Sequence, residues 1–276
     1  MIDFDDRDRV AMAEGSLDIQ IVSHGHADCV RALLDDIGKG GHRVFLLENL
    51  DAVELAIPER DDLSIVRNAS PAGFAENHNR LAALGRAEFI AVLNPDLRLR
   101  AGVFAGLLPL FDDPAVGIVA PRVNSPAGLI EDNARRVVTP ASLFRRHLLG
   151  GRFAQDYPDA SRVCEPDWVA GMFMIIRRRV FEHIGGFDPG FRLYCEDVDI
   201  CLRTWIEGYK VVCVPGRGVV HAAKRASRYN GAHFLWHVAS LWRLWRSPAY
   251  RRFPGRLAPN RGDRAGQTSV LDPDRR

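Results

Sequence analysis

Residues 17–49 read LDIQIVSHGHADCVRALLDDIGKGGHRVFLLEN, and this stretch decides the fold. Apolar runs at 19–22 and 43–47 each predict a strand that ends at polar residues. Between them, residues 27–37 predict a helix that ends at glycine. The apolar positions that share one face of this helix are Val30, Leu33, Leu34 and Ile37. The order of strand, helix and strand is typical of an α/β unit.

The same alternation continues through the first half of the chain. Residues 63–67 and 89–93 predict strands, and residues 74–83 predict a helix between them. These strands are continuous apolar runs, which are typical of strands buried on both faces. The sequence therefore predicts an α/β fold in which a mostly parallel sheet is flanked by helices.

The second half of the chain is less regular. Residues 121–166 contain several Pro and Gly and the pair Arg145-Arg146, so we expect long loops over the sheet edge. The other predicted elements are strands at 117–120, 168–176, 211–214 and 219–221, and helices at 178–184 and 196–207.

Composition narrows the class of protein. The chain has 276 residues, of which 47% are hydrophobic and 26% charged, which is ordinary for a folded soluble protein. Its net charge of +2 argues against a polycation built for nucleic acid. The five cysteines form no CxxC pair. A disulfide framework or a zinc ribbon is therefore not expected, and a cytoplasmic location fits best.

We expect four segments along the chain. Residues 1–16 predict a disordered acidic arm that lacks the basic and apolar regions of a signal peptide. Residues 17–230 form the predicted α/β domain, residues 231–253 a helical segment, and residues 254–276 a disordered tail. No apolar run reaches about eighteen residues, so no membrane-spanning helix is expected.

Polar side chains follow the predicted strands of the first half at the points where those strands end. In open parallel sheets, ligands bind at the carboxyl ends of the strands. These side chains therefore predict a binding site along one edge of the sheet. They are Ser23, His24, Glu48, Asn49, Asn68, Asn94 and Asp96.

Several short motifs follow one another along the chain. They are Asn68-Ala-Ser-Pro-Ala-Gly-Phe74, Asn94-Pro-Asp96, Gly185-Gly-Phe-Asp188, Glu196-Asp197 and His221. In this order the sequence resembles family 2 glycosyltransferases over about residues 17–230, and especially their bacterial rhamnosyltransferase-like branch. The resemblance implies the GT-A fold of nucleotide-diphospho-sugar transferases.

The resemblance also implies a divalent cation, Mg²⁺ or Mn²⁺, on the donor phosphates. Asp96 follows a proline that favours extended backbone before it, and it is the implied carboxylate ligand. Its alternative role is to cap the next helix. His221 is implied as a second ligand, although a lone histidine after apolar residues is more often structural. Asn94 stands where the family often has a first aspartate.

A nucleotide-sugar donor, linked to dTDP or UDP, is implied to lie across the first strands. Ser23 and Glu48 depart from the Thr and Asp that the family usually carries there. For Gly73, simple turn geometry is the alternative to a donor contact. The implied donor-binding residues are Ser23, Glu48, Asn49, Asn68, Gly73, Asn94 and Asp96.

Glu196-Asp197 matches the Glu-Asp motif of the family, in which the Asp is the base for the acceptor hydroxyl. The resemblance implies single displacement with inversion. Both acids open a predicted helix, whose dipole favours an ionised carboxylate. The alternative is that they only stabilise the first turn. Asp199 is expected to pair with Arg203 at i+4.

Residues 233–252 read HFLWHVASLWRLWRSPAYRR and combine an apolar stripe with arginines. Such a helix suits peripheral contact with an anionic membrane at its inner face. Packing on the main domain or on a second subunit is the alternative. Nucleic acid is not expected, because the positive charge is local and no recognition motif accompanies it.

The leading hypothesis is an enzyme that moves a sugar onto a cell-surface glycan or a lipid-linked acceptor, and the resemblance favours rhamnose. One alternative is a nucleotidyltransferase, although His24-Gly25-His26 is a poor phosphate loop. The other is a non-catalytic module that binds a nucleotide sugar or a glycan.

Overall fold

The computed structural model describes residues 17–39, 41–50, 55, 57–140, 143, 156–159, 161–222 and 231–254. The expected acidic arm at 1–16, the pair Arg145-Arg146 and the expected tail from residue 255 onward lie outside these residues.

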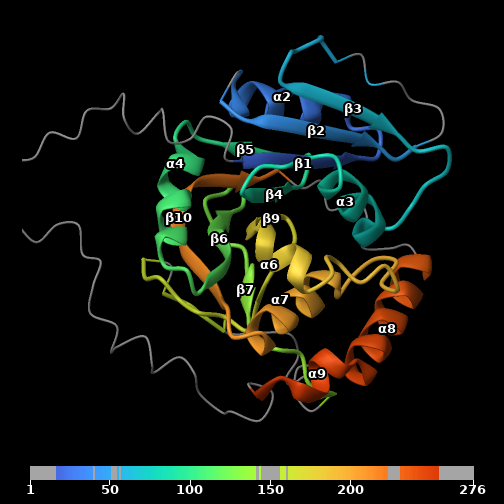
Figure 1. Ribbon diagram of the computed structural model, residues 1–276, viewed down its shortest axis with the longest axis vertical. Coiled ribbons are helices and arrows are strands. Elements are labelled where there is room, and N and C mark those ends of the chain that lie inside the picture. Colours follow the sequence, from blue (N-terminus) through green and yellow to red (C-terminus); the bar gives the residue numbers. More distant parts are fainter. Residues whose placement is uncertain are drawn as a thin grey trace, which may run out of the picture.

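The fold is built on one large mixed sheet, and the predicted α/β class is confirmed (Figure 1). Its strand order is β3-β2-β1-β4-β9-β6-β10-β5. The four strands β3, β2, β1 and β4 run parallel, as do β6 and β10, whereas β9 and β5 are antiparallel to their neighbours. The strands are β1 (Leu17–Ser23), β2 (Arg43–Glu48), β3 (Leu63–Arg67), β4 (Phe89–Leu93), β5 (Leu97–Leu99), β6 (Val116–Asn124), β9 (Phe173–Arg177) and β10 (Lys210–His221).

Helices cover both faces of the sheet. One face carries α2 (Ala27–Ile37), α4 (Val103–Leu107) and the 3-10 turn η1 (Leu108–Asp112). The other carries α3 (Phe74–Ala82), α6 (Arg178–His183) and α7 (Glu196–Ile206), followed by the C-terminal helices. In β4, Ile90 and Val92 belong to the core under α3, α6 and α7, whereas Ala91 and Leu93 belong to the core under α2 and α4. This two-sided burial explains why the strands are continuous apolar runs.

The expected strand at 168–176 is wrong in one respect, because it is two strands in different sheets. β8 (Trp168–Val169) pairs with β7 (Ala134–Arg135) in a small separate sheet, and β9 begins at Phe173. Gly171 lies in the break. The apolar pattern runs through this break, since β8 and β9 are both buried, and so periodicity could not reveal it.

Three further differences lie beyond β4. The strand expected at 117–120 extends over Val116–Asn124, and the two runs expected at 211–214 and 219–221 form the single strand β10 with a register shift. The short strands β5 and β7 were not expected. Residues 121–166 are therefore less irregular at their start than the sequence indicated.

Two helices, α8 (Gly231–Arg246) and α9 (Pro248–Arg252), occupy the segment expected to be helical. Leu241, Leu244 and Tyr250 are buried in the core that also includes α7. The boundary drawn at residue 230 stays a prediction. Within the described ranges, no helix has the length and apolar character needed to cross a bilayer.

A buried ion pair ties the second half of the chain to the first strand. Arg178 on α6 donates to Asp18 Oδ2 at 2.6 Å, and the same oxygen accepts the Ala87 N–H at 2.9 Å. Asp18 is 1% exposed, so its charge has almost no access to water.

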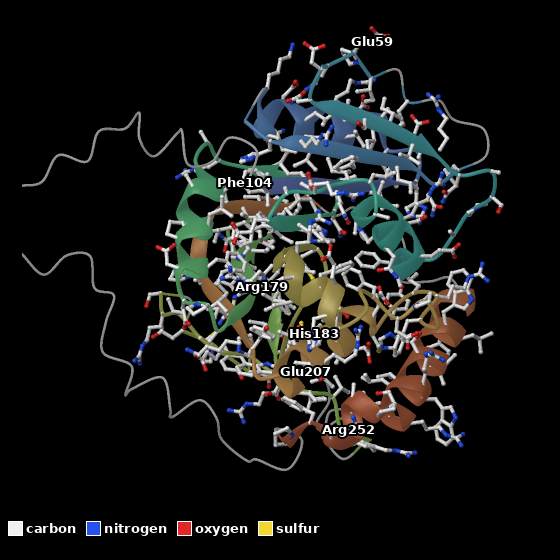
Figure 2. All side chains as sticks on the ribbon, viewed as in Figure 1. Glu59, Phe104, Arg179, His183, Glu207 and Arg252 are labelled. Carbon is white, nitrogen blue, oxygen red and sulfur yellow. The ribbon has the colours of Figure 1, made fainter. Side chains whose placement is uncertain are left out.

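We predict that Arg178→Leu lowers the free energy of unfolding by about 3–5 kcal/mol, because it leaves the Asp18 carboxylate buried and uncompensated. Urea unfolding measures the change. The matched control is Arg179→Leu, whose arginine is exposed and lies beside Arg178 in sequence (Figure 2). Equal stability of the two variants would contradict the prediction.

Candidate active site

Antiparallel pairing of β5 with the end of β10 brings Asp96 next to His221. His221 pairs with Leu97 in this register, and the Ala222 N–H donates to the Asp96 carbonyl at 2.9 Å. As a result, His221 Nε2 lies 3.2 Å from Asp96 Oδ1. Burial acts to raise the pKa of Asp96, but His221 outweighs it and holds that pKa below its ordinary value.

Glu131 completes this group from the opposite side of the imidazole. Its Oε2 lies 2.9 Å from His221 Nδ1. Burial acts to lower the pKa of His221, but Asp96 and Glu131 together raise it. The sequence analysis missed Glu131 because it lies in a stretch expected to be loop, and nothing in the sequence signals its contact with β10.

The Asp96–His221 pair fits a divalent cation. Two adjacent ligands of an octahedral ion, with bonds of about 2.1 Å, lie about 3.0 Å apart. The two atoms here are 3.2 Å apart, and Asp96 Oδ1 is buried without a hydrogen bond to the described residues. Over those same residues, no group of three or more His, Cys, Asp or Glu side chains forms a complete metal cluster. Phosphate and water oxygens would therefore supply the remaining ligands.

Asp197 is held by backbone groups at the start of α7. Its Oδ2 accepts the Gly171 N–H at 3.0 Å, and its Oδ1 accepts the Val198 N–H at 2.8 Å. A Cβ at Gly171 would lie only 3.2 Å from the Phe74 ring, so a side chain there would crowd this contact. Each carboxylate oxygen keeps a further lone pair for an incoming hydroxyl.

The neighbouring Glu196 is buried, and its Oε2 has no hydrogen-bond partner among the described residues. Burial raises the pKa of Glu196 to about 8, and the charge of Asp197 adds to this effect. Burial also raises the pKa of Asp197, against the N–H groups of Gly171 and Val198. Desolvation therefore outweighs these N–H groups, and the pKa of Asp197 lies above its ordinary value. The expected pair of Asp199 with Arg203 is confirmed at 2.7 Å.

The two residues before Glu196 have an unusual backbone. Tyr194 has a φ of 74° and Cys195 a φ of 66°, the left-handed region that non-glycine residues avoid. Such residues cost about 1–3 kcal/mol each and persist only where surrounding contacts over-determine them. The turn therefore depends on neighbours that hold it in place.

Those neighbours come from α3 on one side and α8 on the other. A Cβ at Gly73 would lie 2.8 Å from the Arg192 carbonyl oxygen. Gly73 has a φ of −71°, so close backbone approach, and not turn geometry, requires glycine here. From α8, Ser240 Oγ donates to the Leu193 carbonyl at 2.8 Å, and His237 packs edge-on against Tyr194.

Arg243 of α8 fixes the preceding Gly185-Gly-Phe-Asp188 turn. Its Nη2 donates to both carboxylate oxygens of Asp188, at 3.0 and 2.8 Å. The guanidinium also lies over the ring of Phe191, 5.1 Å from its centroid. The inner side of α8 is thus part of the structure that supports Asp197.

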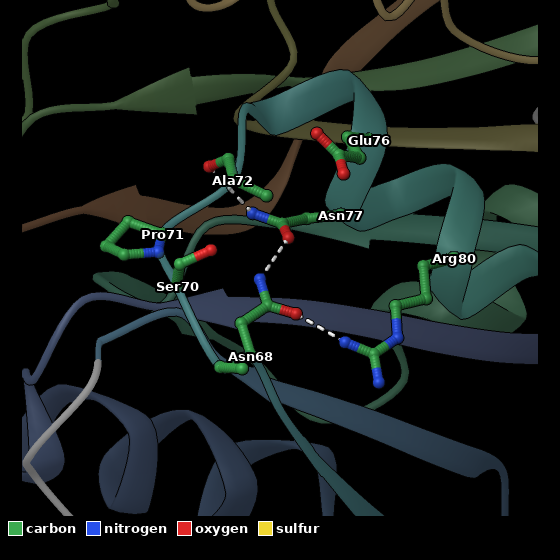
Figure 3. Close-up of a pocket in the computed structure, with 8 residues that line it drawn as sticks. Asn68, Ser70, Pro71, Ala72, Glu76, Asn77 and Arg80 are labelled. Atoms are coloured by element: carbon green, nitrogen blue, oxygen red, sulfur yellow. Dashed lines mark hydrogen bonds between the residues drawn. The ribbon is translucent and has the colours of Figure 1, made fainter.

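The amides predicted to contact the donor form one network with the loop after β3. Asn49 Oδ1 accepts from Asn68 Nδ2 at 2.7 Å and from the Ala72 N–H at 2.9 Å. Asn68 Nδ2 also donates to Asn77 Oδ1 at 2.7 Å, and Arg80 donates to Asn68 Oδ1 (Figure 3). These amides hold the loop, and their contact with a donor stays a prediction.

An open polar pocket of about 290 Å³ lies over this loop. Figure 3 shows Asn68, Asn77 and Arg80 on one side of it, joined by hydrogen bonds. Asp96, His221, Glu196 and Asp197 do not line it. The lining residues are Asn68, Ala69, Ser70, Pro71, Ala72, Glu76, Asn77 and Arg80.

Glu48 and Ser23 are register partners at the ends of β2 and β1. Both oxygens of Glu48 have partners, since Oε1 accepts the Leu55 N–H at 3.1 Å and Oε2 accepts from Arg67 at 2.6 Å. Ser23 Oγ is buried and unpartnered within the described chain. Ser23 thus keeps free hydrogen-bonding capacity for a ligand, whereas Glu48 also has a structural task.

Pairing of β4 with β9 brings the two halves of the site to one edge of the sheet. Leu93 is paired with Phe173, and the Asn94 N–H donates to the Met172 carbonyl at 2.9 Å. Asp96 follows β4 and Gly171, which holds Asp197, precedes β9. Because the strands are antiparallel, the end of β4 and the beginning of β9 coincide.

The family model described as glycosyl transferase family group 2 matches residues 89–250, which is more than half of the chain. The chain belongs to this family. The matched residues include Asp96, Glu131, Glu196, Asp197 and His221.

Curated relatives of this glycosyltransferase include two rhamnosyltransferases. The rhamnosyltransferase WbbL of Escherichia coli K12 is 26% identical over 240 residues, which is 82% of this chain and 90% of the relative. The N-acetylglucosaminyl-diphospho-decaprenol L-rhamnosyltransferase of Mycobacterium tuberculosis is 29% identical over 192 residues. That alignment covers 62% of each protein, so the chain spans under two thirds of the mycobacterial relative. The nucleotidyltransferase and non-catalytic alternatives are not favoured.

Solved structures of glycosyltransferases share the fold, and the expected GT-A fold is confirmed. GalNAc-T7 with UDP, GalNAc and Mn²⁺ has a TM-score of 0.60 at 18% identity, over 78% of this chain and 44% of that one. The mannosyltransferase PcManGT from Pyrobaculum calidifontis, in complex with GDP-Man and Mn²⁺, has a TM-score of 0.51 at 16% identity. It is matched over 93% of this chain and 76% of that one.

We predict that Glu196→Gln removes part of the loss of stability at rising pH. The Glu196 pKa lies at about 8 in the fold against 4.5 for an ordinary Glu, so the folded state alone keeps the proton between these values. Its contribution to stability is present below about pH 4.5 and falls as pH rises to about 8. Gln stays neutral throughout. The free energy of unfolding of the variant, relative to that of the parent, should therefore increase between pH 5 and pH 8.

Urea unfolding at pH 5, 6.5 and 8 measures this difference. The control is Glu165→Gln, which removes an exposed carboxylate elsewhere. A difference between parent and Glu196→Gln that does not change with pH would contradict the prediction.

Proposed function

We propose that this glycosyltransferase is an inverting enzyme that moves a sugar from a nucleotide-diphosphate donor to a hydroxyl of its acceptor. The observation that carries the proposal is the arrangement at one edge of the sheet. There, Asp96 follows β4 and lies beside His221, the last residue of β10, and the Gly171 contact of Asp197 precedes β9. A site for a donor phosphate and a carboxylate base are the two parts that single displacement needs.

Asp197 acts as the base. Two backbone N–H groups fix its carboxylate, and burial raises its pKa, which makes it a stronger proton acceptor than an exposed Asp. A base whose pKa lies nearer the working pH takes a proton more effectively as the new bond forms. The sugar carbon is attacked from the side opposite the leaving diphosphate, so its configuration inverts.

Glu196 has a different role because its pKa of about 8 keeps it mainly protonated at pH 7. A protonated carboxyl donates a hydrogen bond, and the unpartnered Oε2 is available for it. We assign Glu196 to a sugar hydroxyl beside the base. Two adjacent carboxyls with different protonation are a common division of labour in active sites.

Donor binding combines the Asp96–His221 pair with the first strands. A bound divalent cation, Mg²⁺ or Mn²⁺, would neutralise charge on the departing diphosphate. The nucleotide would lie over Ser23, Glu48 and the loop that begins at Asn68 and ends at Gly73. The pocket at that loop is polar and includes Arg80, which suits a nucleoside or a phosphate. Asn94 would contribute beside Asp96.

The named relatives support a rhamnosyl donor, for which we propose a link to dTDP or UDP. They also support an acceptor that is a lipid-linked or cell-surface glycan, because one relative is named for a diphospho-decaprenol acceptor. Both assignments rest on these relatives' names, since no described residue of this chain distinguishes one sugar from another.

Substitutions of the two aspartates test the proposal. We predict that Asp197→Asn lowers turnover at least about a thousandfold while donor affinity changes little, because the amide cannot take the proton. Asp96→Ala should instead weaken Mn²⁺-dependent donor binding. Calorimetry with UDP- and dTDP-sugars, alongside product assays, separates the two effects. Full activity of Asp197→Asn would remove its role as base.

We also propose peripheral contact of α8 with the cytoplasmic face of a membrane. The outer face of α8 consists of Leu235, Val238 and Trp242, spaced i, i+3 and i+7, and their exposed fractions are 67%, 46% and 59%. Arg246 lies over Trp242, 5.3 Å from the ring. The sequence has no Asp or Glu from residue 224 to 262. An exposed apolar stripe with only positive charge nearby suits an anionic lipid surface.

We predict that the enzyme sediments with phosphatidylglycerol vesicles and not with phosphatidylcholine vesicles, and that Leu235→Ser/Trp242→Ser reduces binding at least tenfold. The control is Leu84→Ser, which removes an exposed leucine that is not part of α8. If the parent chain sediments with neither kind of vesicle, α8 does not bind lipid. The same conclusion follows if light scattering shows that the double variant only converts a dimer to a monomer.

A further inference from the structure

We propose that Glu131 is a positioning residue, which fixes the orientation and tautomer of the His221 imidazole so that Nε2 faces Asp96 and a cation bound there. This inference rests on the proposed donor site and adds one residue to it. Glu131 itself does not touch the ion.

The contacts of His221 decide its tautomer. An ionised carboxylate only accepts hydrogen bonds, and Glu131 Oε2 lies 2.9 Å from Nδ1. Nδ1 therefore carries a proton. Nε2, which lies 3.2 Å from Asp96 Oδ1, is then the nitrogen that gives up its proton and turns a lone pair toward a cation when one binds. A histidine that binds a metal commonly donates its other N–H to a carboxylate, which also makes the imidazole a better ligand.

Glu131 can do this because its backbone is held firmly. After β6 the chain turns at residues 125–129 and returns alongside the strand, with an antiparallel bridge between Asn124 and Ile130. The Glu131 N–H donates to the Val123 carbonyl at 2.8 Å. Val123 is itself the register partner of Val219 on β10, two residues before His221.

A buried asparagine also holds this returning segment against β6. Asn133 is fully buried, and its Nδ2 donates to the Pro121 carbonyl at 2.8 Å. The Asn133 N–H donates to the Glu131 carbonyl at 2.8 Å. Glu131 thus lies in a segment that is hydrogen-bonded to β6, the strand next to the one that carries His221, and this rigidity is what a positioning residue needs.

The alternative is that His221 is a charged imidazolium that joins two carboxylates for structural reasons alone. The two hypotheses involve the same contacts but predict different responses to a metal ion. If the role is structural alone, replacing Glu131 changes stability and leaves ion affinity unaffected. If Glu131 is a positioning residue, replacing it weakens the affinity for the ion.

The experiment measures Mn²⁺ affinity by electron paramagnetic resonance of free Mn²⁺, with UDP or dTDP present, on the full chain. We expect Glu131→Gln and Glu131→Ala to weaken Mn²⁺ binding about 10–100-fold. Asp132→Asn is the matched control, because it removes the adjacent carboxylate, which pairs with Arg135 at 3.1 Å and not with His221. Its affinity should stay within about twofold of the parent.

Wild-type affinity in both Glu131 variants would overturn the inference and leave the donor site intact. No Mn²⁺ binding by the parent with either nucleotide would instead overturn the donor site, and this inference with it. Asp96→Ala removes a proposed ligand, and its Mn²⁺ affinity is the reference for a site that has lost one ligand.

Nitrogen-15 NMR of His221 in the parent protein gives a second measurement that needs no variant to fold. A neutral ring protonated at Nδ1 in saturating Mg²⁺ and nucleotide supports the inference. An imidazolium that persists under the same conditions overturns it.

Discussion

Every part of the site depends on the hydrogen bonding of β4 to strands of opposite direction on its two sides. β4 runs parallel to β1 and antiparallel to β9. The parallel side places Ser23 and Asp96 at the same edge, since the carboxyl ends of parallel strands coincide. The antiparallel side places the beginning of β9, and with it Gly171 and Asp197, at that edge too. One central strand thereby joins a donor-binding half to a half that carries the base.

The site retains polar atoms that the fold leaves without partners. Ser23 Oγ, Asp96 Oδ1 and Glu196 Oε2 are all buried and have no hydrogen bond within the described chain. Burying such groups unpaired costs about 1–3 kcal/mol each in a native protein. The left-handed turn at Tyr194 and Cys195 adds to this cost. The packing of the remaining core must offset both the unpaired polar atoms and the strained turn. A ligand that forms hydrogen bonds with these atoms would remove the first of these two costs.

Much of the first half of the fold could be predicted from the sequence, because β1, β2 and β4 are buried on both faces and α2 and α3 each have one apolar face. The break at Gly171 could not, since apolar residues continue across it. Asp96 and Asp197 could be found through motif order. Glu131 could not, because its role comes from a contact across β6 with His221, and no local pattern encodes that contact. The raised pKa of Asp197 could not be predicted either, because it results from burial, which depends on the tertiary structure.

The bond of Arg243 to Asp188 has a consequence for how this chain changes over time. These residues are 55 positions apart, yet the guanidinium fills the space beside Gly190 where even a methyl group would clash. A side chain at position 190 would therefore displace the guanidinium and weaken its bond to Asp188. A helix α8 taken from a related enzyme makes this contact only where the glycine-rich turn offers a carboxylate at position 188 and free space at position 190, so changes in the helix and in the turn are coupled here.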